Sequence, residues 1–149
     1  MFGNQLVCDK DENILYDNNR LLSLPINVSI NNVAQKVTEL QGIMYPAHID
    51  RQAYSIMRIL GFIPDNLNIH AVEIANDIGE ARKKYRFLNS NKYTIIQASD
   101  AHDIDQLGSR TTRFYIEKPT FDEIKKAIEQ IDGRRAEIFS KNDQQGIEK

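Results

Sequence analysis

The chain has 149 residues, of which 41% are hydrophobic and 27% charged, and its formal net charge is −2. This composition is typical of one ordinary globular domain, and the near-neutral charge argues against a nucleic-acid binder with a clustered basic excess. No apolar run approaches the roughly 18–20 residues of a membrane span, and the first residues lack the features of a signal peptide. The single cysteine, Cys8, excludes an internal disulfide and favours a cytoplasmic protein.

The pattern along the chain predicts a hairpin followed by alternating helices and strands. Two short apolar pairs flank the polar residues 9–13 and predict the hairpin. Apolar residues at three- and four-residue spacing predict helices over residues 30–40, 51–60, 78–88 and 120–131. Apolar runs of strand length predict strands over residues 42–46, 69–75, 93–97 and 112–116. This alternation predicts an α/β fold with mostly parallel strands.

Local signals also predict where elements begin and where the domain ends. Ser29 precedes the first apolar stripe and is expected to cap its helix. Thr120 and Glu123 have the spacing of a capping box at the start of the last helix. Polar residues dominate after the last helix, so we expect a domain over 1–134 and a polar C-terminal tail over 135–149.

Histidine and aspartate side chains follow two of the predicted strands. His48 and Asp50 come after the strand at 42–46, and Asp100 and His102 come after the strand at 93–97. In parallel α/β folds, functional residues gather beyond the carboxyl ends of the strands. Imidazole and carboxylate groups are good ligands for Zn, Mn or Fe, so these two loops could hold one divalent metal ion.

Each candidate residue also has an ordinary structural interpretation. His48 can bond to a neighbouring backbone group, Asp100 can begin a turn, and His102 can have no ligand role. Glu73 stands between two apolar residues, where a lone buried carboxylate is costly; it lies either in a polar barrel interior or on an exposed edge. Arg51 is either a surface residue at the start of a helix or a residue whose guanidinium binds a phosphate through two hydrogen bonds.

At these residues the sequence resembles the PHP (polymerase and histidinol phosphatase) superfamily, and within it the bacterial PHP-domain phosphoesterases. The resemblance runs from about residue 2 to residue 134 and rests on the segments 45–51, 54–55, 60–64, 72–74, 98–102 and 114–133. It implies the C-terminal portion of a distorted (β/α)7 barrel, so that residues 1–134 are a partial PHP domain. It also implies hydrolysis of a phosphomonoester or nucleotide phosphate by a metal-bound hydroxide.

The resemblance assigns roles residue by residue. His48, Asp100 and His102 match metal ligands of the family, and Arg51 lies where a phosphate contact is expected. Asp50 and Glu73 are assigned to the same pocket. The H-x-H motif and the bridging glutamate of the family have no match here, so we expect a C-terminal half in which the divalent metal is substoichiometric or absent.

This mismatch leaves an alternative function. The chain can be a non-catalytic fragment, or a binding or structural module that needs a partner chain or self-association to complete the barrel. The expected partners are a small phosphorylated substrate, a second copy of the chain or an N-terminal half chain. Neither a membrane nor a nucleic acid is expected as a partner.

Overall fold

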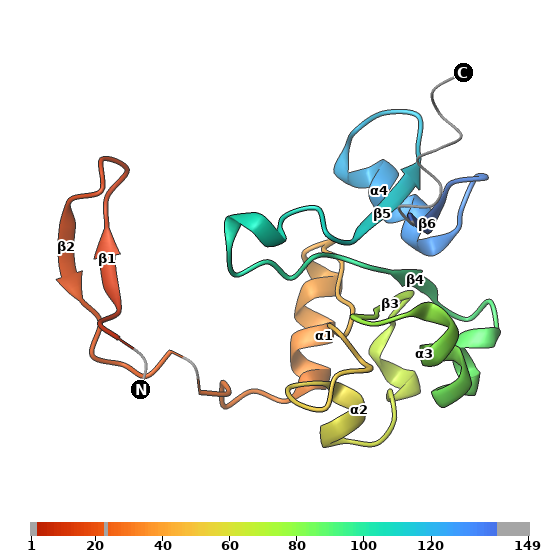
Figure 1. The fold of residues 1–149 in the computed structure, drawn as a ribbon, viewed down its shortest axis with the longest axis horizontal. Coiled ribbons are helices and arrows are strands. Elements are labelled where there is room, and N and C mark those ends of the chain that lie inside the picture. The colour runs from red at the N-terminus through yellow and green to blue at the C-terminus, as the bar shows by residue number, and fades with distance from the viewer. Residues whose placement is uncertain (1–2, 23, 140–149) are drawn as a thin grey trace.

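The computed structural model describes residues 3–22 and 24–139, which form a mixed α/β fold (Figure 1). The strands form three pairs: β1 (Leu6–Cys8) with β2 (Ile14–Asp17), β3 (Ala71–Glu73) with β4 (Thr94–Ile96), and β5 (Thr111–Tyr115) with β6 (Arg135–Phe139). The α-helices are α1 (Ile30–Glu39), α2 (Ile56–Ile59), α3 (Ile78–Lys84) and α4 (Phe121–Glu129). Short 3-10 helices cover Asp65–Leu67, Arg86–Asn89 and Ile104–Gln106. No helix in the described ranges is long and apolar enough to cross a bilayer.

The α/β prediction is confirmed, but of the two strand pairs that follow the predicted hairpin only one has the predicted parallel direction. β3 and β4 are parallel, with Val72 opposite Ile95. The pairs β1–β2 and β5–β6 are antiparallel. Periodicity indicates that a segment is a strand but carries no information about the direction of its neighbour. The half barrel therefore stays a prediction, whereas a mixed arrangement of small sheets is what the described residues form.

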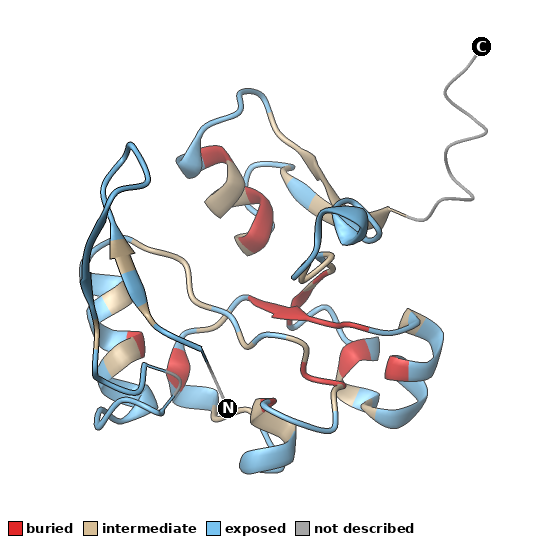
Figure 2. Ribbon diagram, turned by 60° about the vertical axis from the view of Figure 1, so that its left-hand side comes forward, coloured by how far each residue is buried: buried red, intermediate tan, exposed pale blue. Residues whose placement is uncertain are grey.

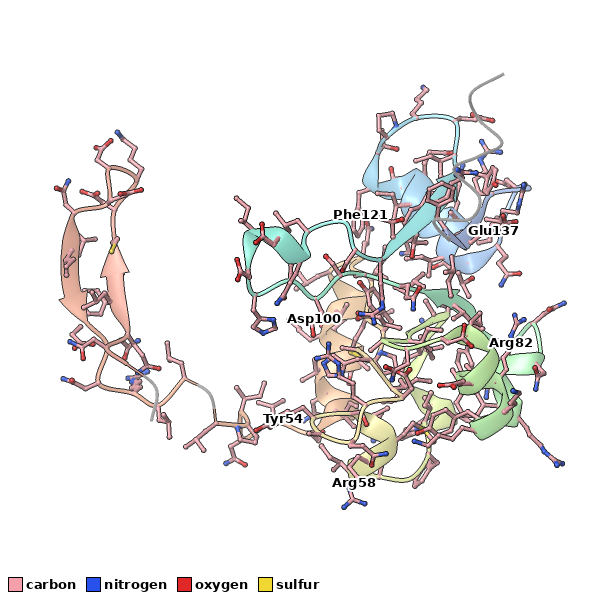
Figure 3. The ribbon with its side chains drawn as sticks, in the orientation of Figure 1. Tyr54, Arg58, Arg82, Asp100, Phe121 and Glu137 are labelled. Carbon is pink, nitrogen blue, oxygen red and sulfur yellow. The ribbon has the colours of Figure 1, made fainter. Side chains whose placement is uncertain are left out.

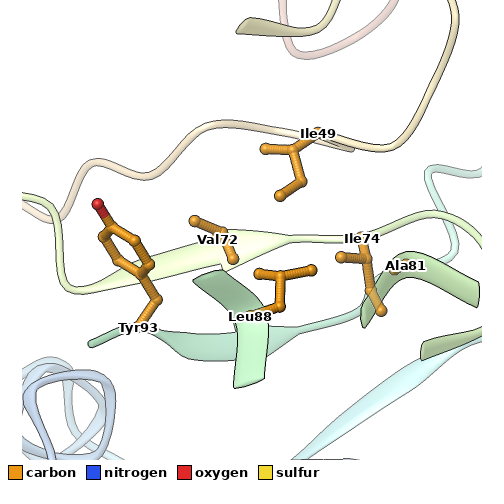
Figure 4. Close-up of a cluster of buried hydrophobic side chains, with 6 residues drawn as sticks. All are labelled: Ile49, Val72, Ile74, Ala81, Leu88 and Tyr93. Atoms are coloured by element: carbon orange, nitrogen blue, oxygen red, sulfur yellow. The ribbon is translucent and has the colours of Figure 1, made fainter. Parts of the chain in front are cut away.

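The hydrophobic core is centred on β3 and β4. Buried residues lie on these two strands and on the helices that pack against them (Figure 2). The core cluster in Figure 4 consists of Ile49, Val72, Ile74, Ala81, Leu88 and Tyr93. Each fully buried aliphatic side chain of this kind contributes about 1.5–3 kcal/mol, so this cluster is what fixes the strand ends in place.

The predicted helices are present, but two of them are shorter than their apolar stripes. Ser29 caps α1 as predicted, because its hydroxyl accepts a hydrogen bond from the Asn32 backbone N–H. The stripe over 51–60 yields only α2, because Tyr54 has a φ of 57° that a helix cannot contain and Ser55 then caps the new start. The stripe over 78–88 is divided into α3 and the 3-10 helix Arg86–Asn89.

The boundary of the C-terminal tail is a correction. Residues 135–139, predicted as the beginning of the tail, form strand β6, and residues 140–149 lie outside the described residues. In β6, Ala136 and Ile138 are half-buried while Arg135 and Glu137 are exposed. This two-residue alternation is the signal of a half-buried strand, and the high charge of the segment masked it.

The N-terminal hairpin is confirmed, and it extends away from the rest of the chain (Figure 1). Ile14, Leu15 and Tyr16 are each more than half exposed on it. The hairpin therefore contributes little to the core that positions the candidate site.

Candidate functional site at the carboxyl ends of β3 and β4

The backbone around His48 forms an irregular bridge to the end of β3. The Glu73 N–H donates to the carbonyl of Pro46 at 3.1 Å, and the Ile49 N–H donates to the carbonyl of Glu73 at 2.9 Å. In a regular parallel bridge the two partners are two residues apart, whereas these are three apart. One extra residue must be accommodated, and His48 has a φ of 31° in this bulge. The strand predicted over 42–46 is consequently a coil that only contacts β3.

The next residues of the same segment hold this bulge in place. Ile49 is completely buried in the core. The two carboxylate oxygens of Asp50 accept from the backbone N–H groups of Ala75 at 2.7 Å and Asn76 at 2.8 Å. Asp50 therefore joins the bulge to the chain just after β3, and its oxygens are used for this structural purpose.

His48 and Glu73 bring two functional groups to one buried place. Among the described residues, the Nδ1 atom of His48 is buried and has no hydrogen-bond partner. Glu73 is also buried, and burial raises the pKa of its carboxyl group. The Asp100 carboxylate raises this pKa further, while His48 and Arg51 act against the rise. Glu73 therefore lies inside the site and not on an exposed edge.

The loop after β4 completes the cluster with an ion pair. Asp100 Oδ2 lies 2.6 Å from Arg51 Nη1, and Figure 3 labels Asp100 in this loop. Asp100 has a φ of 49°, so it and His48 are both non-glycine residues with positive φ. Six other non-glycine residues of the described chain share this conformation, so the contacts of these two loops, and not their φ values, make them candidates for function.

The structure thus separates the predicted site residues into two groups. It brings His48, Arg51, Glu73 and Asp100 together. His102 is exposed, and its Nδ1 atom is bonded to the Asp100 carbonyl at 2.8 Å, so it faces its own loop.

Tyr45 also lies close to Glu73 at the site. Burial and the neighbouring Glu73 carboxylate raise the pKa of the Tyr45 hydroxyl. Its position within the matched segment 45–51 was the signal that could have identified it.

The described residues do not complete a metal centre. No group of three or more His, Cys, Asp or Glu side chains within residues 3–22 and 24–139 could hold a metal ion. The Arg51 guanidinium pairs with the Asp100 carboxylate, so that carboxylate is already neutralised. An imidazole, a guanidinium and two carboxylates remain, and these groups can bind a phosphate and hold or release a proton.

Solved structures similar to this chain are endonucleases. One is the lesion-specific endonuclease EndoQ from Pyrococcus furiosus, with a TM-score of 0.60 and 26% identity. Another is endonuclease Q in complex with a 27-mer duplex substrate that has an abasic lesion at the active site, with a TM-score of 0.61 and 25% identity. Each match covers 74% of this chain and 29% of the endonuclease. No protein-family model and no curated protein matches the chain.

The expectation that excluded nucleic acid is wrong. The endonuclease in the second match is in complex with a 27-mer duplex substrate, so the similarity points to nucleic acid and does not exclude it. The exclusion rested on a net charge of −2, which is an average over the whole chain. Such an average hides the basic run at 82–86, and local charge is what a phosphate backbone contacts.

Proposed function

We propose that this chain is part of a metal-dependent hydrolase that cleaves phosphodiester bonds in DNA, with His48, Glu73 and Asp100 at its site. The observation that carries the proposal is the meeting of these side chains at the carboxyl ends of β3 and β4, where the buried His48 Nδ1 has no partner among the described residues. The similarity to an endonuclease in complex with a 27-mer duplex substrate supports DNA as the substrate.

The groups present suit recognition of a phosphodiester. Arg51 offers a planar fork of N–H donors, which matches two phosphate oxygens. Glu73, whose pKa is raised, keeps a proton more readily than an exposed carboxyl and is suited to move one during hydrolysis. Because the described residues hold no group of three ligands, a metal ion that serves this site needs ligands from outside them.

A second candidate function is binding of DNA without cleavage. The observation that favours it is the ion pair between Arg51 and Asp100, in which the guanidinium neutralises a carboxylate that a metal ion would need. His102, bonded to its own loop, does not add a third ligand there. The two functions share the same partner and differ only in catalysis.

Hydrolysis of two chromogenic esters tests the proposal. The chain is assayed with bis(4-nitrophenyl) phosphate, a diester, and 4-nitrophenyl phosphate, a monoester, in the presence of Mn²⁺, Mg²⁺ or Zn²⁺. We expect metal-dependent hydrolysis of the diester that falls at least about tenfold in His48→Ala and in Asp100→Asn. His70→Ala is the matched control, because His70 is exposed just before β3, at the opposite end of the strand.

Three results would contradict the proposal. Absence of diester hydrolysis with every metal overturns the enzymatic function and leaves the binding module. A preference for the monoester overturns the diester assignment. An equal loss in His48→Ala and His70→Ala places the activity elsewhere in the chain.

A further inference from the structure

A run of basic residues covers the last turn of α3 and the 3-10 helix after it. Residues 81–92 include no acidic residue and five basic ones: Arg82, Lys83, Lys84, Arg86 and Lys92. Lys92 forms an ion pair with Asp65, whereas the other four form no ion pair with any described residue. Arg82, Lys83 and Arg86 are exposed, and together they are called the basic cluster below.

The basic cluster borders a groove between α3 and β6. Arg82, Lys83 and Arg86 line a shallow hollow with Asn89. Arg82 also lines the neighbouring groove of about 450 Å³, which Arg135 borders from the side of β6. The two hollows share Arg82 and therefore lie next to each other, and together they are called the path below.

The β6 side of this groove presents a fixed guanidinium. The Cζ atom of Arg135 lies 3.7 Å from the centre of the Tyr115 ring, and its Nε donates to Glu137 at 2.8 Å. On the same face of the β5–β6 pair, Arg113 Cζ lies 4.0 Å from the Phe139 ring centre. Stacking of this kind holds a guanidinium in place, so less side-chain entropy is lost when it binds a phosphate.

We propose that the path from the basic cluster to Arg135 binds the phosphate backbone of duplex DNA. The inference rests on the proposed function and adds a contact surface outside the candidate site. Clustered cations release counterions when they meet a polyanion, so a nucleic-acid backbone is the best complement of the basic cluster. Arg135 adds a stacked guanidinium to the path, although Glu137 on the same groove pairs with it. The exposed amides of Asn89 and Asn91 line the same path and add neutral donors for phosphate oxygens.

The spacing between the basic cluster and the candidate site suits one duplex. α3 begins just after Asn76, where Asp50 holds the end of β3, and the basic cluster lies at the other end of the helix. Seven helical residues rise about 10 Å, which is roughly three steps of 3.4 Å along a DNA strand. Figure 3 shows Arg82 and Asp100 well apart on the molecule. A duplex bound at the candidate site is therefore long enough for its phosphate backbone to reach the basic cluster as well.

Helix stability explains only part of this charge. Basic residues in a last turn interact favourably with the helix dipole, which accounts for Arg82 and Lys83. Arg86 lies beyond the end of α3, and Arg135 comes from another element on the far side of the groove. The helix dipole therefore does not explain why basic residues from two elements line the same path, whereas a bound phosphate backbone does.

Charge reversal with a matched control tests the inference. The variant Arg82→Glu/Lys83→Glu/Arg86→Glu is compared with Lys10→Glu/Lys36→Glu/Lys118→Glu, which changes the net charge equally at other exposed positions. Binding of a short labelled duplex is followed by fluorescence anisotropy over a range of salt concentrations. We expect the first variant to bind the duplex at least about tenfold more weakly. The slope of log K against the logarithm of the salt concentration should become shallower by about 2.7, because three phosphate contacts are lost. The control should change affinity about twofold or less.

Three outcomes overturn the inference. If both variants lose affinity equally, only the net charge matters. If both bind as tightly as the unaltered chain, the contact lies elsewhere, and if the unaltered chain binds no duplex at low salt, DNA is not the partner. Circular dichroism verifies that each variant is folded. If the triple variant unfolds, Arg82→Gln/Arg86→Gln replaces it, and its affinity should fall while the control stays constant.

The same variants separate this inference from the proposed function. The basic-cluster variant should hydrolyse bis(4-nitrophenyl) phosphate at the unaltered rate, because this small ester does not reach the groove. If the chain binds duplex DNA through the basic cluster but hydrolyses no ester, the proposed function fails and the inference stands. If it hydrolyses the diester but the variant binds DNA normally, the inference fails alone.

Discussion

Arg51 Nη1 lies 2.6 Å from Asp100 Oδ2, and this ion pair connects the bulge at His48 with the loop after β4. The two side chains are 39% and 31% exposed, so solvent screens the pair and its loss should lower stability by less than about 1 kcal/mol. The guanidinium matters more for the electrostatics of the site than for stability. Without it, the carboxylates of Glu73 and Asp100 repel each other and attract a cation.

We therefore expect Arg51→Gln to bind Mn²⁺ more tightly than the unaltered chain in isothermal titration calorimetry. Arg58→Gln on α2 is the control, since Arg58 is exposed and forms no ion pair with a described residue. Unchanged Mn²⁺ affinity in Arg51→Gln would show that the guanidinium does not compete with a cation at Asp100.

Asp50 should matter for stability more than for chemistry. Its carboxylate accepts two short hydrogen bonds from the backbone after β3, at 2.7 and 2.8 Å. Hydrogen bonds to a charged group contribute about 1.5–3 kcal/mol each, and their loss leaves a buried N–H unsatisfied. Asp50→Ala should lower the free energy of unfolding by about 3 kcal/mol in urea denaturation. Asp105→Ala, at an exposed position, should change it by less than about 0.5 kcal/mol. A similar small change in Asp50→Ala would refute the structural role.

Stability in acid should depend on Glu123. The Arg134 guanidinium holds the pKa of the Glu123 carboxyl at about 2, below its ordinary 4.5. The folded chain thus binds this proton less readily than the unfolded chain, so the stabilisation is fully present above pH 4.5 and is lost as the pH falls toward about 2. Thermal unfolding across this range should show a steeper decline for the unaltered chain than for Glu123→Gln. Parallel declines would contradict the assignment.

Local features of the fold were predictable because neighbouring residues determine them. Ser29 and Thr120 cap their helices as their positions indicate, and each hydroxyl accepts a backbone N–H three residues ahead. The second half of the capping box at Glu123 was not predictable. That carboxylate accepts from the Glu117 N–H and from Arg134, both outside the helix. A partner from another element is decided by tertiary packing, which a local motif does not contain.

The candidate site shows the same division. Strand ends and residue types predicted that His48 and Asp100 would lie in neighbouring loops, and they do. The bulge at His48, the use of Asp50 by the backbone and the turn of His102 toward its own loop depend on hydrogen bonds between distant or strained segments. The exclusion of nucleic acid failed for a different reason, since a net charge does not report where the charges lie.

The central claim is that the cluster at His48 belongs to a hydrolase that acts on DNA. The most direct measurement is strand scission of a labelled duplex with one abasic site, followed on a denaturing gel with Mn²⁺ present, for the unaltered chain, His48→Ala and His70→Ala. We predict scission by the unaltered chain and by His70→Ala, and a rate at least about tenfold lower in His48→Ala. Scission that is equal in all three proteins, or absent in all three, would contradict the claim.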